Sequence, residues 1–272
     1  TDLLRMSIAW QGNFVSLTTM AQVSYQEPGN KNNAIPRVLG KPIIATGIYP
    51  GWTSTEPDFR DPRPAGPNPL AIGRGPIAAE QGRWNGLDVA GREAVLSYTI
   101  AGTDIHEQVG SVLVSGQLGI TRTFDITEAA LMLVMAEVPA GGSVEVNEST
   151  VLHGSTRDSA TSVGMVGAPA GTRLQLDSNR YVTLRIPAGA AASRFRVVAW
   201  RGAATERGVM RAMLAEPVHM AEFAHGGGDV RRRRLDRVGH RSWIGKTRVE
   251  AIRVRRVRTA QRERRARHDL HP

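Results

Sequence analysis

Apolar and polar residues alternate with a period of two over most of the first 228 positions of the chain. The clearest run, "RWNGLDVAGREAVLSYTIAGTDIHEQVG" at 83–110, places Leu96, Tyr98 and Ile100 on one face and is interrupted by two Gly-containing turns. Because successive side chains of a strand point to opposite faces, this run predicts a meander of antiparallel strands.

Similar short runs bounded by turn residues predict further strands, at 3–10, 14–20, 41–47, 120–127, 130–138, 181–189 and 194–202. The first two flank Gln-Gly-Asn and read as a hairpin, whereas only 205–217 has helical spacing, which ends at Pro217. Roughly ten or more strands with frequent turns are typical of an all-β protein. We therefore expect an antiparallel β-sandwich or a larger two-sheet fold with one short helix.

The stretch "TSTEPDFRDPRPAGPNPL" at 53–70 contains five prolines together with three carboxylates and two arginines. Proline fixes φ and biases the preceding residue towards extended backbone, so this stretch predicts a long loop rather than a helix or strand. A loop stiffened in this way loses less entropy on ordering and holds its charged side chains in set directions.

The net charge of +10 comes entirely from the end of the chain. Residues 229–272 carry 15 Arg and one Lys against five acids, while the preceding 228 residues carry 19 basic and 20 acidic groups. We therefore divide the chain into a β-sandwich-type domain at 1–228 and an Arg-rich tail at 229–272, which we expect to be disordered or poorly packed.

Three interpretations of the tail remain open. It is an arm that binds nucleic acid through phosphate contacts, a solvated tail without a specific partner, or a peptide translated out of frame from GC-rich DNA. The last interpretation is suggested by the presence of only three lysines in the whole chain and by the loss of strand alternation after Gly228. We assign the tail no function and do not expect a nucleic-acid partner.

Several chemistries are not supported by the sequence. Without cysteine the chain has no disulfide, no thiolate metal site and no CxxCH haem attachment, and the histidines lack metal-ligand spacing, so we expect no metal and no cofactor in this chain. No P-loop or dinucleotide fingerprint is present, and no run reaches the roughly 18 apolar residues of a membrane span.

Five segments carry a family resemblance: "TDLLRMSIAW", "PGWTSTEPDFRDPRP", "GLDVAGREAVLSYTIAGTDIHE", "ITRTFDIT" and "RIPAG…RFRVVAWRG". In this order they resemble a domain of unknown function from large secreted bacterial proteins, over most of residues 1–228. In those proteins the domain lies near c-type haem modules, sugar-dehydrogenase-like modules or carbohydrate-related domains. The resemblance implies an exported, multi-domain parent of which this chain is a fragment, with haem elsewhere in the parent, and it assigns no catalytic residue.

The proline-rich loop is the first candidate site, because binding residues concentrate on such loops. It either covers a face or edge of a sheet or forms a rim that binds sugar or a cation, with a tryptophan as stacking platform. The candidate ligand-binding residues are Trp52, Glu56, Asp58, Arg60, Asp61, Arg63 and Trp84.

Catalysis by paired carboxylates is the alternative, with Asp58, Asp61, Arg122 and His106 as candidates. We expect an accessory domain that binds carbohydrate or another extracellular ligand, or that organises neighbouring domains of the longer chain. The other hypotheses are a carbohydrate-active hydrolase or lyase and a purely structural spacer.

Overall fold

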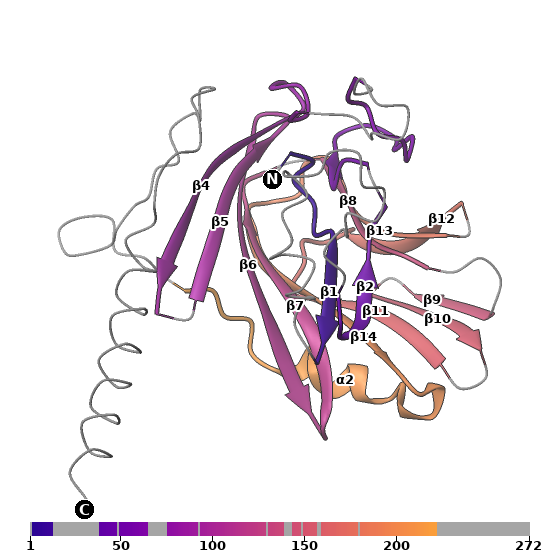
Figure 1. Cartoon of the computed structure of the whole chain (residues 1–272). Helices are drawn as coiled ribbons and strands as arrows, with labels where there is room; N and C mark the ends of the chain where they lie inside the picture. The colour runs from indigo at the N-terminus through magenta and orange to yellow at the C-terminus, as the bar shows by residue number, and fades with distance from the viewer. Residues whose placement is uncertain are drawn as a thin grey trace, which may run out of the picture. The chain divides into compact units, whose positions relative to one another are not determined.

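The computed structural model describes residues 2–12, 38–47, 49–64, 75–91, 93–128, 130–138, 143–147, 149–156, 159–178 and 180–221 (Figure 1). Within them the regular secondary structure is mostly antiparallel strand. The strands are β1 (Ile8–Gln11), β2 (Lys41–Ala45), β3 (Trp52–Thr53), β4 (Gly82–Ala90), β5 (Glu93–Ile100), β6 (Thr103–Val114), β7 (Gln117–Ile126), β8 (Leu131–Glu137), β9 (Ser143–Asn147), β10 (Thr150–Thr156), β11 (Ser159–Val166), β12 (Arg173–Asp177), β13 (Tyr181–Ile186) and β14 (Ser193–Gly202). A 3₁₀ turn, η1 (Ala204–Glu206), and a short helix, α2 (Val209–Ala215), follow.

The strands form two main sheets and one small one. The larger sheet has the order β4-β5-β6-β7-β14-β11-β10-β9, the smaller has the order β12-β13-β8-β3, and β1 pairs with β2. The expected meander is confirmed as β4-β5-β6. Its second turn, Ala101-Gly102, has φ angles of 46° and 86°, as two-residue hairpin turns require.

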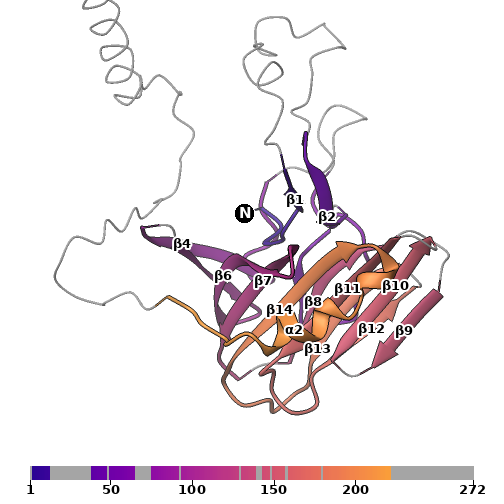
Figure 2. The same ribbon diagram turned by 90° about the horizontal axis from the view of Figure 1, so that it is seen from below.

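The main core lies between the two large sheets, which lie one above the other in Figure 1 and overlap in the view of Figure 2. Phe124 and Phe195 of the eight-stranded sheet and Leu133 and Leu184 of the four-stranded sheet are all 0% exposed and belong to one apolar cluster. Ile44 of β2 joins the same cluster. The all-β, two-sheet prediction is therefore confirmed.

Helix α2 packs on the other face of the larger sheet. Its Met210 and Met213 bury Val198 and Trp200 of β14 in a second cluster. The guanidinium of Arg196 donates to the main-chain oxygens of Met213, Glu216 and Pro217 at 2.6–2.9 Å. A cation among the otherwise unpaired carbonyls at the C-terminal end of the helix fixes α2 to the sheet.

Some expectations differ from the structure or fall outside it. Strands β9 to β12 were not located from the sequence, and the predicted helix at 205–217 divides into η1 and α2. The expected strand at 14–20 and the Arg-rich tail at 229–272 lie outside the described residues. Among the described residues, no helix has both the length and the apolar character needed to cross a bilayer.

Candidate functional site

The proline-rich loop lies over the face of the four-stranded sheet that points away from the core. It leaves β3, which pairs with β8, and the ring of Phe59 stacks on Tyr181 of β13 with centroids 3.9 Å apart and planes within 9°. The Tyr49 ring meets both rings edge to face, at 5.7 Å and 5.4 Å. The loop therefore covers this face of the sheet around Phe59.

Ion pairs attach the loop to the sheet and to itself. Glu56 accepts two hydrogen bonds from Arg185 of β13, at 2.6 and 2.9 Å, and Asp177 accepts a third from the same guanidinium at 3.2 Å. Within the loop, Arg63 binds Asp61 through Nε and Nη2 at 2.8 and 2.9 Å. Arg63 therefore binds the Asp61 carboxylate bidentately.

Phe59 has a left-handed backbone, with φ of 51°. Such a conformation is costly for a bulky residue and persists only where the surroundings enforce it. Here the aromatic stack holds the side chain, and the main-chain N–H of Arg60 donates to Asp58 Oδ1 at 2.7 Å in the next step of the turn. The loop is therefore held in one defined, locally strained conformation.

A pocket of about 230 Å³ opens between this loop and the sheet. One part of its wall is apolar, formed by aromatic, proline and valine side chains, and the rest carries hydroxyl, carboxylate, amide and guanidinium groups. We call it the loop pocket, and its lining residues are Tyr49, Pro50, Thr53, Thr55, Glu56, Pro57, Asp58, Phe59, Arg60, Pro62, Gln81 and Val134.

The electrostatics of the loop pocket are set by neighbouring charges and by burial. Hydrogen bonds from Arg185 hold the pKa of Glu56 below its ordinary value. Burial, with a smaller contribution from the Glu137 charge, raises the pKa of Tyr49 to about 12. At neutral pH the pocket therefore contains an ionised Glu56 and a neutral phenol.

The structure brings together only part of the predicted binding set. Glu56, Asp58 and Arg60 line the loop pocket, whereas Asp61 and Arg63 pair with each other and are absent from its lining. The two tryptophans lie elsewhere. Trp52 is 2% exposed and packs edge to face on Phe124, and Trp84 lines a different cavity over the larger sheet.

The catalytic candidates are dispersed. Arg122 is a core residue, 2% exposed, whereas His106 is exposed on the same sheet. His106 neighbours Glu107 along β6, so its side chain points to the face opposite the core. Asp58 is exposed, and Asp61 forms an ion pair with Arg63. The four catalytic candidates therefore do not surround a common cleft.

A buried polar cluster surrounds Arg122, which the sequence marks only as a catalytic candidate. Arg122 donates to Glu107 through Nε at 2.6 Å and through Nη2 at 3.1 Å, and the Tyr98 hydroxyl donates to Glu107 at 2.6 Å. The indole N–H of Trp52 donates in turn to the Tyr98 oxygen at 2.9 Å. Strand alternation indicates that both charged residues are buried, because Glu107 shares a strand face with Ile105 and Arg122 shares one with Phe124.

Charge and burial act in opposite directions in this cluster. Burial alone would lower the pKa of Arg122, but the charge and hydrogen bonds of Glu107 outweigh it and raise that pKa. Burial, assisted by the Glu107 charge, raises the pKa of Tyr98 well above its ordinary value. The cluster therefore contains one internal ion pair and a neutral tyrosine.

No group of three or more His, Asp or Glu side chains is placed to hold a metal ion within the described ranges. The fold and the loop pocket together define an all-β two-sheet domain with a preformed surface pocket.

Comparison with known proteins adds a partial family match. A family model described as a domain of unknown function (DUF6797) matches residues 1–107, which include the 53–64 loop. The resemblance to a domain of unknown function is confirmed over these residues. No curated protein matches the chain.

Two solved structures titled "Heparinase III-BT4657 gene product", one with methylated lysines, are similar to part of the chain. They share 14% and 13% sequence identity with TM-scores of 0.30 and 0.29. Each match covers 44% of this chain and 21% of the other, so the chain spans about a fifth of that protein's length.

Proposed function

We propose that this chain is a non-catalytic accessory domain that binds carbohydrate in the loop pocket. The observation that carries the proposal is the composition of the pocket wall, in which aromatic and proline faces stand beside carboxylate, hydroxyl and amide groups. A sugar ring has the same mixture, with apolar C–H faces and a rim of hydroxyl groups. Pockets with an apolar wall and few polar groups are the usual form of small-molecule sites.

The Asp58 carboxylate in the loop pocket can accept further hydrogen bonds. A carboxylate offers roughly four lone-pair sites. Asp58 uses one oxygen for the main-chain N–H of Arg60 and the other for the Arg60 guanidinium at 3.3 Å, and its side chain is 63% exposed. Asp58 can therefore accept hydrogen bonds from sugar hydroxyls without losing its own partners.

The loop is also ordered before a ligand arrives. The Glu56–Arg185 pair and the Phe59–Tyr181 stack fix the walls of the pocket, so binding does not need to order them. Preorganisation of this kind raises affinity by reducing the entropy lost on association. The exported, multi-domain setting that the resemblance implies supports an extracellular polysaccharide as the source of the sugar.

The test is a screen of the full chain against neutral mono- and oligosaccharides on a glycan array, followed by calorimetric titration of each hit. Asp58→Ala should weaken the binding of a hit at least about tenfold, because hydrogen bonds to charged groups are among the stronger ones. Glu80→Ala removes an exposed carboxylate outside the pocket lining and should leave affinity unchanged. The absence of any hit, or equal affinities for the two variants, would contradict the proposal.

A further inference from the structure

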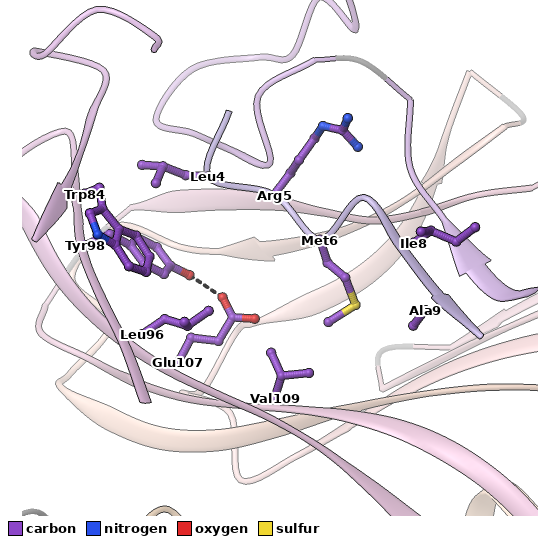
Figure 3. A pocket seen from close by; sticks show the side chains of 10 residues that line it. All are labelled: Leu4, Arg5, Met6, Ile8, Ala9, Trp84, Leu96, Tyr98, Glu107 and Val109. Carbon is purple, nitrogen blue, oxygen red and sulfur yellow. Dashed lines mark hydrogen bonds between the residues drawn. The ribbon is translucent and has the colours of Figure 1, made fainter. Parts of the chain in front are cut away.

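A second cavity, of about 270 Å³, lies over the larger sheet. Its lining lacks the rim of polar groups that would suit a carbohydrate. The N-terminal segment at 4–9 forms one side and strands β4, β5 and β6 form the other (Figure 3). Most of its lining is apolar, and the residues are Leu4, Arg5, Met6, Ile8, Ala9, Trp84, Leu96, Tyr98, Glu107 and Val109. We call it the sheet cavity.

The Glu107 carboxylate points into the sheet cavity from the β6 side (Figure 3). Its Oε2 accepts hydrogen bonds from Tyr98 and from Arg122 Nη2, and its Oε1 accepts one from Arg122 Nε. Since each carboxylate oxygen has about two acceptor sites, Oε1 retains one. In Figure 3 the oxygen without the bond to Tyr98 is turned towards Met6, across the cavity.

The sheet cavity presents no net charge to a ligand. Arg122 of the neighbouring strand β7 neutralises Glu107 from the same face of the sheet. Arg5 lines the cavity through its chain, but its guanidinium donates to the hydroxyl and carbonyl of Thr46 and is directed away in Figure 3. An ion of either sign would lose its hydration here without gaining an opposite charge.

The size and the walls limit the ligand further. An apolar cavity of about 150 Å³ holds a benzene ring, so this one holds roughly ten to twelve non-hydrogen atoms. Trp84 contributes an aromatic wall beside Tyr98, its neighbour across β4 and β5. Val109 is 44% exposed whereas Tyr98 is 2% exposed, which places the open side of the cavity at Val109.

We propose that the sheet cavity binds a neutral, mainly apolar ring compound that carries one hydroxyl group. The ring packs against Trp84, Leu96 and Met6, and the hydroxyl donates its hydrogen to Oε1 of Glu107. This site is separate from the loop pocket and takes a different class of ligand, because its lining offers one free acceptor rather than a polar rim.

The test uses para-propylphenol and propylbenzene as a matched pair of probes, titrated calorimetrically into the full chain. They share a body of suitable size and differ only in the hydroxyl group. We expect para-propylphenol to bind at least about tenfold more tightly, because its hydrogen bond is to a charged acceptor. Propylbenzene is the more apolar probe, so an advantage of apolar transfer alone would reverse the order.

Two tryptophan substitutions on β6 locate the binding. Val109→Trp fills the open side of the cavity and should weaken para-propylphenol binding at least about tenfold. Leu113→Trp is its matched control, because Leu113 lies on the same strand face, is 68% exposed and is outside the cavity lining. This variant should bind within about twofold of the parent chain, as independent sites generally do.

Three outcomes would overturn the inference: no binding of para-propylphenol, equal or tighter binding of propylbenzene, or equal affinities for Val109→Trp and Leu113→Trp. Both substituted residues are exposed, so loss of folding is not the expected cause of a lost signal. Any carbohydrate bound at the loop pocket should be bound equally by both variants, which separates the two proposals.

Discussion

Two of the bidentate arginine–glutamate pairs, Glu107–Arg122 and Glu56–Arg185, have contacts of similar length in opposite surroundings. In both Glu107–Arg122 and Glu56–Arg185 the shortest contact is 2.6 Å and a second bond joins the same two groups. The arginine and glutamate side chains are 2% and 5% exposed in the first pair and 20% and 79% exposed in the second.

The difference in burial determines what each pair contributes. Burying two charges costs hydration free energy that their mutual attraction only just offsets, so a buried pair adds little net stability. Removing one of the two partners is nevertheless costly, because the other charge is then buried alone. An exposed pair is screened by water and also adds little. Both pairs therefore act chiefly through position: one aims a carboxylate at the sheet cavity, and the other holds the loop that forms the loop pocket.

The largest expected effect comes from removing one member of the buried pair. Glu107→Leu leaves the Arg122 cation in the core without its partner and should lower the free energy of unfolding by about 3–5 kcal/mol. Urea denaturation of the full chain measures the change. Since domains are typically stable by about 5–15 kcal/mol, this loss is a large fraction of the total, and the urea midpoint of the variant should fall well below that of the parent chain.

The double variant Glu107→Leu, Arg122→Met provides the control for this prediction. Removing both charges should restore most of the stability, because a buried ion pair and an apolar pair of similar volume are often about equally stable. Together with Arg122→Met alone it completes a double-mutant cycle. If the double variant is as unstable as Glu107→Leu, the pair contributes net stability and the comparison with the surface pair fails.

A smaller effect is expected at the hydroxyl that links the buried pair to Trp52. Tyr98→Phe removes a donor to Glu107 and an acceptor for the Trp52 indole, and leaves that N–H unpaired in the core. The expected loss is about 1–3 kcal/mol in urea denaturation. Tyr181→Phe, at a half-buried ring, should change stability by less than about 0.5 kcal/mol, and equal losses in the two variants would be evidence against the network.

The sequence predicts the strands in which apolar and polar residues alternate strictly. The β4-β5-β6 meander alternates and carries clear turn residues, and its pairing is the one expected. Strands such as β10 (TVLHGST) and β11 (SATSVGMV) are rich in Ser, Thr and Gly and lack that contrast. Their pairing depends on neighbours far along the chain, as in the pairing of β11 with β14, which local pattern does not encode.

The candidate site was predictable in kind but not in detail. Proline and charge marked the loop, and Glu56, Asp58 and Arg60 do line its pocket. The tryptophans predicted as stacking platforms lie elsewhere, since Trp52 is buried in the core and Trp84 lines the sheet cavity. Which face of a sheet a tryptophan occupies depends on register, and register is a tertiary property.

The smallest effect on stability, and the most local one, is expected at the surface pair. Glu56→Gln removes the charge that Arg185 holds and should leave the urea midpoint nearly unchanged. Hydrogen exchange of the main-chain amides at 54–60, corrected for intrinsic rates, should nevertheless become faster at neutral pH. The exposed Glu80→Gln should change neither measurement.

Acidification should reproduce the effect of Glu56→Gln in the parent chain. The hydrogen bonds from Arg185 lower the pKa of Glu56 in the folded chain below the unfolded value of 4.5. Because the folded pKa is the lower one, the contribution of the pair is fully present above pH 4.5 and disappears as the pH falls through the lowered pKa. Loop exchange in the parent should therefore accelerate towards that of Glu56→Gln over this window, while the variant stays level. A parallel pH dependence in both proteins would show that groups other than Glu56 hold the loop.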